Sequence, residues 1–314
     1  MPATTIRNKV KNSPILDVIL EAVKASMTVV RGRQGGFGFD VEIKRDKSLL
    51  TTTDKASEKI AMEILLNNLP QDLGIHAEER GKIRMGNKRI LFDPIDGTKP
   101  FIVGATTSTV IAALYDEILN KITICVVGDP ATGRIWSAET EKGVTLREHD
   151  FSDDNGEYTN AISSFCRVTP PATLGETGRT VFCDFYPDFK RKGRTVLSNF
   201  EIAMLFEGLF GIYGVTMLGS NGAHHALVAN GAQGIAGAIT TAIGGPWDVA
   251  PALLVTEAGG FARAFTVLPD GELADRDPLD PESFDILITA VTETDLTAMV
   301  SILFKAKSAC EGEK

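Results

Sequence analysis

Cysteine is scarce in this chain of 314 residues, which contains only Cys125, Cys166, Cys183 and Cys310. No two of them have Cys-x-x-Cys spacing, and none has a histidine at zinc-ligand spacing, so the sequence argues against a zinc finger and a redox dithiol. We expect inert or buried thiols in the reducing cytoplasm. The segment Met1–Pro14 has no apolar stretch of the kind that a secretory signal needs, which agrees with a cytoplasmic location.

Runs of basic residues are also missing. The 32 Lys and Arg residues face 41 Asp and Glu residues, which gives a formal net charge of −9 and a pI of about 5.1. A protein that binds a nucleic-acid polymer or an anionic membrane usually carries a basic patch or stripe. The composition therefore disfavours both partners and leaves a small molecule as the expected ligand.

Long apolar runs are absent as well, although one segment invites that interpretation. Between Gly208 and Trp247 there is no charged residue, but polar residues such as Ser220, Asn221 and Asn230 interrupt the segment, and glycines recur throughout it. A membrane-spanning helix needs about 20 predominantly apolar residues in succession. The segment predicts a buried part of an α/β core.

The composition is otherwise that of a globular protein, with 43% hydrophobic and 23% charged residues. At about 150 residues per domain, the length predicts two domains. We expect an N-terminal α+β domain over residues 1–150 and a C-terminal α/β domain over residues 151–314. The boundary is placed in the polar segment Glu148–Tyr158.

Hydrophobic periodicity and turn residues predict the main elements. In the helix that starts at Asp54, we expect Ile60, Ile64 and Leu65 to face inward. A glycine-rich segment over residues 31–39 lacks the Gly-Lys-Ser/Thr of a phosphate loop and is predicted to be a turn. Helices are expected over Pro14–Val30, Asp54–Asn68, Asn199–Phe210 and Ala250–Ala258, and strands over Arg89–Phe92, Thr109–Tyr115, Lys121–Val127 and Thr180–Cys183.

The most informative segment is Asp93-Pro-Ile-Asp96-Gly97-Thr98, which follows the apolar run Arg89–Phe92. Pro94 favours an extended Asp93, Gly97 permits a tight turn, and a helix that starts near Thr98 would present free N–H groups. Two carboxylates would then lie beside an amide-lined anion site. Mg²⁺ is commonly held by a few carboxylates together with phosphate oxygens. An Asp-Pro turn in which Asp96 caps a helix is the structural alternative.

Other acidic residues stand at the ends of predicted elements. Asp54 and Asp248 each precede a predicted helix, where an N-cap is the simplest interpretation. Glu78 and Glu79 follow an apolar stretch, and a solvated loop is the alternative for them. Taken together, these acidic residues and the Asp93–Asp96 pair indicate a site for several metal ions. The adjacent His224 and His225 would point in different directions on a helix, so we expect core or loop residues there.

These motifs, in this order, resemble those of the inositol monophosphatase family of magnesium-dependent, lithium-sensitive phosphatases. The resemblance extends over nearly the whole chain. It is carried by Thr51-Thr-Thr-Asp54, Glu78-Glu79, the segment Asp93–Thr98, the pair Gly219-Ser220, Trp247-Asp248-Val-Ala-Pro, and Val255-Thr-Glu-Ala-Gly-Gly260.

The resemblance implies a layered αβαβα sandwich, a homodimer and two to three Mg²⁺ ions per site. The N-terminal domain would supply most ligands, and the C-terminal domain Asp248 and the substrate side. Implied metal ligands are Glu78, Asp93, the Ile95 carbonyl, Asp96 and Asp248, with Asp93 bridging two ions. Asp54 and Thr98 would orient the attacking water, a third ion would lie near Glu78, and Glu79 would be structural. Gly97, Thr98, Gly219 and Ser220 would contact the substrate.

Two departures from the family pattern concern the substrate. The segment Lys99-Pro100-Phe101 after Thr98 resembles the bisphosphate-nucleotidase and histidinol-phosphatase branches. The stretch Ala236–Pro246 has no acid where the inositol branch carries a glutamate, with Ala238 or Thr241 at that position. We therefore predict a phosphoric monoester hydrolase that is not selective for inositol 1-phosphate. Alternatives are a histidinol-phosphate phosphatase, a 3′(2′),5′-bisphosphate nucleotidase, a fructose-1,6-bisphosphatase and a non-catalytic binding dimer.

Overall fold

The computed structural model describes residues 12–34, 40–43, 49–152, 157–168, 178–186, 189–231 and 234–309. Within them the helices are α1 (Pro14–Arg31), α2 (Thr52–Asn68), α3 (Thr98–Ile102), α4 (Asn199–Phe210), α5 (Asn221–Ala229), α6 (Ala252–Glu257) and α7 (Glu293–Ser308). No described helix is both long and apolar enough to cross a membrane. Residues 35–39 of the predicted glycine-rich turn lie outside the described residues.

A first, eight-stranded sheet contains the strands of the first half of the chain, in the order β10-β9-β8-β7-β6-β5-β3-β4. All neighbours are antiparallel except β3 and β5, which are parallel. The strands are β3 (Gly74–Ala77), β4 (Gly81–Arg84), β5 (Lys88–Asp96), β6 (Thr109–Asp116), β7 (Lys121–Asp129), β8 (Arg134–Glu139), β9 (Val144–Ser152) and β10 (Glu157–Cys166).

A second, six-stranded sheet has the order β14-β11-β15-β18-β16-β17, with β11 parallel to both of its neighbours. Its strands are β11 (Thr180–Asp184), β14 (Gly214–Thr216), β15 (Ile235–Thr240), β16 (Phe261–Val267), β17 (Leu273–Arg276) and β18 (Ile286–Ala290). Two short pairs complete the described strands, β1 (Val41–Ile43) with β2 (Leu49–Thr51), and β12 (Lys190–Arg191) with β13 (Arg194–Thr195).

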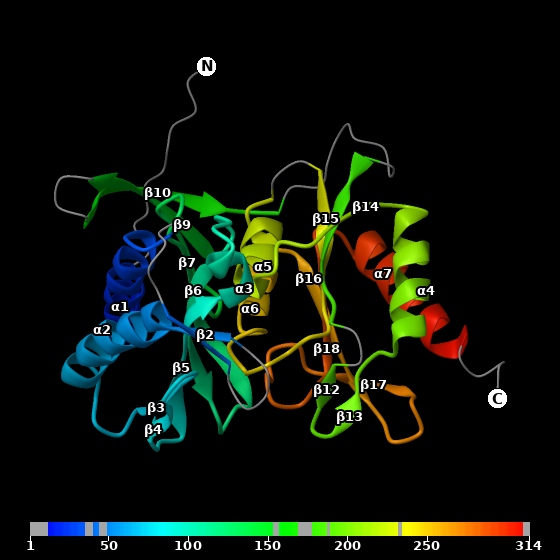
Figure 1. The fold of residues 1–314 in the computed structure, drawn as a ribbon, viewed down its shortest axis with the longest axis horizontal. Helices are drawn as coiled ribbons and strands as arrows, with labels where there is room; N and C mark the ends of the chain where they lie inside the picture. The colour runs from blue at the N-terminus through cyan, green and yellow to red at the C-terminus, as the bar shows by residue number, and fades with distance from the viewer. Residues whose placement is uncertain are drawn as a thin grey trace.

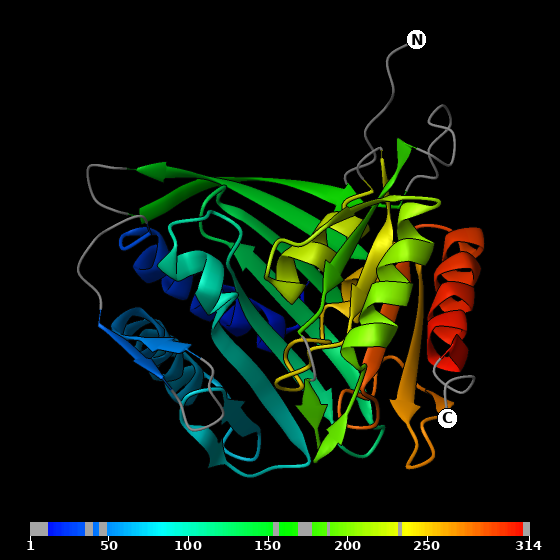
Figure 2. The ribbon, with the colours of Figure 1, turned by 45° about the vertical axis from the view of Figure 1, so that its right-hand side comes forward.

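The elements stack in five layers. Figures 1 and 2 show α1 and α2 on one face of the first sheet and α5 and α6 on the other, followed by the second sheet and then α4 and α7. Three hydrophobic clusters fill the spaces between these layers. The predicted αβαβα sandwich is therefore confirmed.

The helix α1 illustrates how the sequence forms the outermost layer. Ser13 caps its N-terminus by accepting the Leu16 N–H, and Pro14 takes the first helical position, where its missing N–H costs nothing. Ile19, Val23 and Met27 recur at helical spacing and are fully buried against the first sheet and α2. Burying each such side chain contributes about 1.5–3 kcal/mol before the entropic cost.

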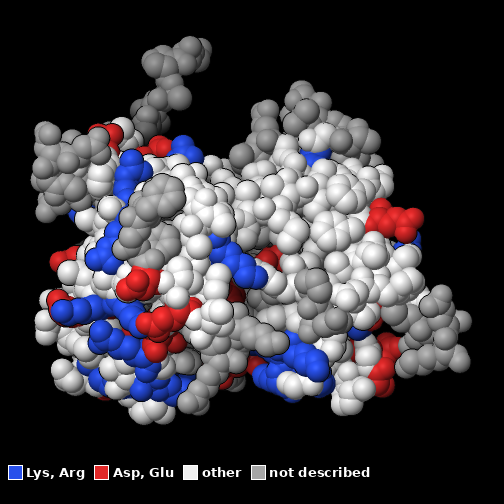
Figure 3. Space-filling model, viewed as in Figure 1, with Lys and Arg blue, Asp and Glu red and all other residues white. Residues whose placement is uncertain are grey.

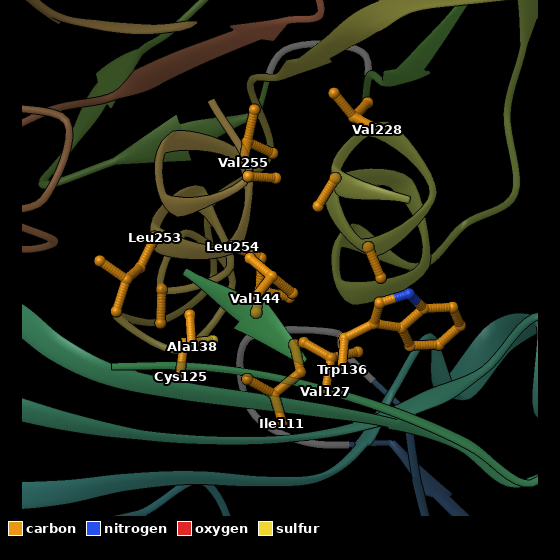
Figure 4. Packing of buried hydrophobic residues seen from close by; sticks show 14 of the residues in the cluster. Ile111, Cys125, Val127, Trp136, Ala138, Val144, Val228, Leu253, Leu254 and Val255 are labelled. Carbon is orange, nitrogen blue, oxygen red and sulfur yellow. The ribbon is translucent and has the colours of Figure 1, made fainter. Parts of the chain in front are cut away.

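The middle of the molecule is a layer that the two sheets share. Figure 4 shows Ile111, Val127 and Trp136 of the first sheet beneath the two helices, in one cluster with Leu254 and Val255 of α6 and Val228 of α5. The same cluster includes residues of β11 and β15 in the second sheet. The helices α5 and α6 therefore cover the inner faces of both sheets at once.

Most predicted elements lie where the sequence places them, with three differences. The inward face of α2 is formed by Ala61, Met62 and Leu65, while Ile60 and Ile64 are only half-buried, because the side of the helix that packs on α1 and β5 carries the first three residues. The polar segment from Glu148 to Tyr158 contributes to strands β9 and β10, and the chain leaves the first sheet only after Cys166. The predicted helix at Ala250 begins at Ala252, four residues after Asp248.

Candidate active site

The strand β5 delivers two aspartates to one end of the first sheet. Every residue from Arg89 to Asp96 is buried, and the Asp93 carboxylate turns back to accept the Ile95 N–H at 2.9 Å. Gly97 then adopts a left-handed conformation, with φ of 87°, and is the N-cap of α3. A Cβ atom there would lie 2.7 Å from the Gly219 carbonyl oxygen, so only glycine fits this turn.

Three buried carboxylates converge at this point. Asp93, Asp96 and Asp248 each offer an oxygen, and these oxygens all lie within 4.8 Å of one another. We call them the carboxylate triad. Burial and the neighbouring charges of Glu78, Asp96 and Asp248 raise the pKa of Asp93 well above its ordinary value. Burial and the charges of Asp96 and Glu78 do the same to the pKa of Asp248.

Asp248 comes from the loop after β15 and is held by backbone donors. Its Oδ2 accepts the N–H of Gly244 at 2.6 Å and the N–H of Gly245 at 2.9 Å. It therefore closes its own loop and is not the N-cap of the following helix, whose N-cap is Pro251. This corrects the simplest interpretation of the sequence.

Asp96 is tied to the start of α5. Its Oδ2 accepts from the hydroxyls of Ser220 (2.5 Å) and Thr109 (2.8 Å) and from the Gly222 N–H (2.7 Å), and its Oδ1 accepts the Asn221 N–H (3.2 Å). A Cβ on Gly222 would lie 2.3 Å from the Thr109 hydroxyl, so this close approach requires glycine. Ser220, predicted to contact the substrate, is almost fully buried and directs its hydroxyl to Asp96 and Thr109.

Asp54 lies on α2 and forms a capping box with Thr51, which is the actual N-cap. Its Oδ2 accepts from the Thr51 N–H at 2.7 Å and from the Thr51 hydroxyl at 2.5 Å, while its buried Oδ1 has no hydrogen-bond partner among the described residues. Burial, opposed by these hydrogen bonds and reinforced by the charge of Glu78, raises the pKa of Asp54 to about 6. The N-cap predicted for Asp54 is wrong by three residues.

Glu78 and Thr98 lie at the border of the triad. The Glu78 N–H donates to the Phe92 carbonyl at 2.9 Å, which places Glu78 just beyond the end of β3 and beside β5. Its carboxylate is hydrogen-bonded to Asp93. Thr98 is half-buried, and its hydroxyl donates to the Ile95 carbonyl oxygen at 3.3 Å. The predicted ligands and the predicted water-orienting pair thus lie around one point.

The family follows from a comparison with known sequences. The sequence model of the inositol monophosphatase family matches residues 11–301. The chain belongs to this family. A histidinol-phosphatase from Chlorobaculum parvum is 30% identical over 135 residues, which are 43% of this chain and 51% of that protein. The chain thus matches about half the length of this relative.

One further relative of this family member and one solved structure cover more of the chain. Inositol monophosphatase 3 from Solanum lycopersicum is 28% identical over 256 residues, 78% of this chain and 84% of that protein. Among solved structures, the extragenic suppressor protein SuhB from Bartonella henselae aligns with a TM-score of 0.69 and 21% identity. This alignment covers 92% of this chain and 98% of that chain. At that identity the structural likeness establishes the fold.

The donor set of this family member fits divalent cations. The triad consists of oxygen donors only, which hard cations such as Mg²⁺ prefer. Burying several negative charges together costs free energy unless cations or protons compensate them. The raised pKa of Asp93 and of Asp248 expresses this cost.

Sequence reasoning missed two groups of residues. Glu58 on α2 is buried, accepts the Glu79 N–H at 2.8 Å and pairs with Arg80 at 3.2 Å, so it orders the turn after Glu78. The sequence offered one signal for Glu58, because it stands four residues after Asp54 and therefore on the same face of the predicted helix. Asp184 at the end of β11 and Asn221 on α5 also lie near the triad. Only their three-dimensional contacts reveal this. His224 and His225 are buried in α5, as predicted.

Proposed function

We propose that this chain is a Mg²⁺-dependent phosphatase that hydrolyses a small phosphate monoester with water as the nucleophile. The observation that carries the proposal is the convergence of three buried carboxylates beside Asp54, Glu78 and Thr98. Glu78, Asp93 and the Ile95 carbonyl would hold a first ion, and Asp93, Asp96 and Asp248 a second. A third would lie near Glu78.

When bound, such ions neutralise phosphate charge and acidify a water molecule. The chain's own residues would orient the reactants. Asp54 keeps one buried oxygen free, and its pKa of about 6 suits a group that accepts a proton near neutral pH. Together with the Thr98 hydroxyl it would align the attacking water, while the N–H groups of Gly97 and Thr98 would bind the phosphate. We assign Ser220 to positioning Asp96, and the Gly219 backbone to the substrate side.

The proposed substrate is a small phosphate ester other than inositol 1-phosphate alone. The stretch from Ala236 to Pro246 contains no acid, and the Thr241 hydroxyl donates to the Asp184 carbonyl at 3.0 Å. A wall without a charged acceptor at this position cannot select inositol strongly. Relatives named histidinol-phosphatase and inositol monophosphatase support a polar alcohol as the leaving group. Bisphosphorylated nucleotides and fructose 1,6-bisphosphate are further candidate substrates and should be included in the kinetic screen described below.

A kinetic screen of phosphate esters tests this proposal. We expect phosphate release from several of about thirty esters with Mg²⁺, loss of activity after exhaustive chelation, and recovery when Mg²⁺ is added back. The best substrate should match or exceed inositol 1-phosphate in kcat/KM. Activity that survives chelation would contradict the metal site, and a hundredfold preference for inositol 1-phosphate would contradict the proposed specificity.

A non-catalytic binding dimer is the alternative function, and the ligand set disfavours it. Glu78, Asp93, Asp96 and Asp248 are all present and close together, whereas a binding protein has no need to retain them. On the face shown in Figure 3, the basic and acidic side chains of the described residues are interspersed and form no continuous basic surface for a nucleic-acid polymer. The proposal includes a cytoplasmic homodimer that lithium inhibits. Light scattering and a lithium titration of turnover test these two properties.

A further inference from the structure

Asp184 ends strand β11 on the side of the second sheet that faces the carboxylate triad. Its partner in the adjacent parallel strand is Thr240, so the two residues lie at the same end of the sheet. Asp184 is buried, with 6% of its surface exposed, and interacts electrostatically with Asp96 and with Lys99 of α3. The Lys99 ammonium lies 4.0 Å from the centre of the Tyr186 ring. Asp184 is therefore near both the triad and this cation.

A chain of buried side chains leads from the core to Asp184. Thr289 contacts His225 Nδ1 at 2.9 Å, His225 Nε2 contacts Thr240 at 3.2 Å, and Thr240 donates to Asn221 Oδ1 at 3.1 Å. The side chain of Asn221 is hydrogen-bonded to the Asp184 carboxylate. We call Thr289, His225, Thr240 and Asn221 the buried polar chain. All four residues are at least nine-tenths buried.

The donors and acceptors fix the direction of this chain. Because the single hydroxyl proton of Thr240 goes to Asn221, His225 Nε2 must donate to Thr240. Burial lowers the pKa of His225 to about 3, so the neutral ring carries one N–H, and its Nδ1 accepts from Thr289. The Oδ1 of Asn221 is used as an acceptor, which leaves its NH₂ group to donate to Asp184. In each of these four hydrogen bonds, the hydrogen therefore points along the chain toward the Asp184 carboxylate.

We propose that Asp184 recognises a hydrogen-bond donor, a hydroxyl or an ammonium group, on the alcohol that leaves the phosphate, and that the buried polar chain positions it. This inference rests on the proposed phosphatase function. The buried polar chain supplies one donor to a carboxylate that can accept several, and the adjacent stretch from Ala236 to Pro246 supplies no acid of its own. The acceptor for the leaving group therefore comes from β11.

Paired esters with the same carbon skeleton test the role of Asp184. Glycerol 2-phosphate and isopropyl phosphate differ only in two hydroxyls, and 2-aminoethyl phosphate and ethyl phosphate differ only in an amine. For the full chain with Mg²⁺, we expect kcat/KM to favour the donor-bearing ester in at least one pair. Asp184→Asn should reduce that ratio about 10- to 100-fold, the range for a hydrogen bond to a charged group. If Asp184→Asn lowers kcat/KM only for 2-aminoethyl phosphate, the group that Asp184 recognises is an ammonium.

A second pair of variants tests the positioning role. Thr240→Val removes the hydroxyl that links His225 to Asn221 and should lower the same ratio several-fold, whereas Thr240→Ser should restore it. Asp116→Asn, at the far end of β6, is the matched control and should leave the ratio unchanged. The Thr240 pair also decides the question if Asp184→Asn fails to fold.

The outcomes separate the two proposals. Equal losses on donor-bearing and donor-free esters, or a change only in the Mg²⁺ concentration required, would overturn the role of Asp184 and leave the phosphatase proposal intact. No turnover of any ester of the full kinetic screen by the unmodified chain, with Mg²⁺ present, would overturn both.

Discussion

The carboxylate triad and the Asp184 side of the site are built in different ways. Two triad members, Asp93 and Asp96, come from one strand and stand three residues apart. The opposite side is assembled from β11, α5, β15 and β18, and single hydrogen bonds of its buried polar chain join residues that lie up to 64 positions apart. Chemistry common to a family can therefore be encoded in a short motif, while the proposed selection of a leaving group would depend on the packing of several elements.

The largest expected effect comes from the triad. Asp93→Asn should lower kcat/KM more than about 10³-fold for every ester, because Asp93 would serve two ions and its charge cannot be replaced. Circular dichroism should show a folded protein, since an asparagine oxygen can still accept the Ile95 N–H. Activity close to that of the unmodified chain would refute the metal assignment.

Thr98→Ala should be the next largest effect. We expect kcat to fall about 10²–10⁴-fold, with a smaller change in KM, because the hydroxyl would position the attacking water on the way to the transition state. Thr98→Ser is the matched control and should retain most of the rate. If only KM rises, Thr98 contacts the substrate and the role of Asp54 needs revision.

On the Asp184 side of the site, the burial of His225 should make the stability of the protein depend on pH. The pKa of His225 is lowered by burial to about 3, against 6.5 in the unfolded chain. The unfolded state therefore binds the extra proton first, and the stability that neutral His225 contributes above pH 6.5 is lost as the pH falls toward 3. Between pH 7.5 and pH 5, the free energy of unfolding of the unmodified chain should therefore fall by about 2 kcal/mol more than that of His225→Gln. Urea unfolding of both proteins at the two pH values measures this difference. If the free energies of unfolding of the two proteins change with pH in the same way, His225 is not a buried neutral ring.

The smallest expected effect again concerns the triad, now without metal. The raised pKa of Asp248 means that its charge destabilises the fold at neutral pH, so Asp248→Asn should raise the metal-free free energy of unfolding by about 1 kcal/mol. The same variant should lose most of the stabilisation by Mg²⁺.

Asp116 provides the matched control for that measurement. Although burial opposes it, hydrogen bonds from Lys88 and from the Leu119 and Ile118 backbone lower the pKa of Asp116. Asp116→Asn should therefore destabilise the protein at neutral pH. Destabilisation of both variants in chelator would argue against crowded charges in the triad.

How much the sequence could predict depends on how local each signal is. The helix over Asn199–Phe210 was predicted with its actual bounds from its hydrophobic pattern, and the structure shows a capping box of Ser198 and Glu201 at its start and Gly211 after its end. The acidic motif Asp93–Thr98 at the end of β5 was predicted because Pro94 and Gly97 are local signals as well. A hairpin between β9 and β10 was missed because its polar, half-exposed residues resemble a linker until the neighbouring strand is known.

The site residues show the same limit. Asp54 was expected at the wrong cap position because Thr51 and Thr52 are equally good caps in sequence, and only the geometry of the capping box selects Thr51. Asp184 has no motif around it, and Asn221 stands in a run of small residues. Their roles depend on which strand lies beside which, and a single sequence does not state this. The division into two domains stays a prediction.

The shared layer of α5 and α6 has a consequence for how this protein can evolve. Since both sheets use these two helices as their inner cover, neither half can be exchanged for an unrelated module without exposing the other half's apolar face. Exchange of a whole half is therefore obstructed. We expect new substrate preferences to arise by changes that leave the shared layer intact, and position 184 at the end of β11 is one such place.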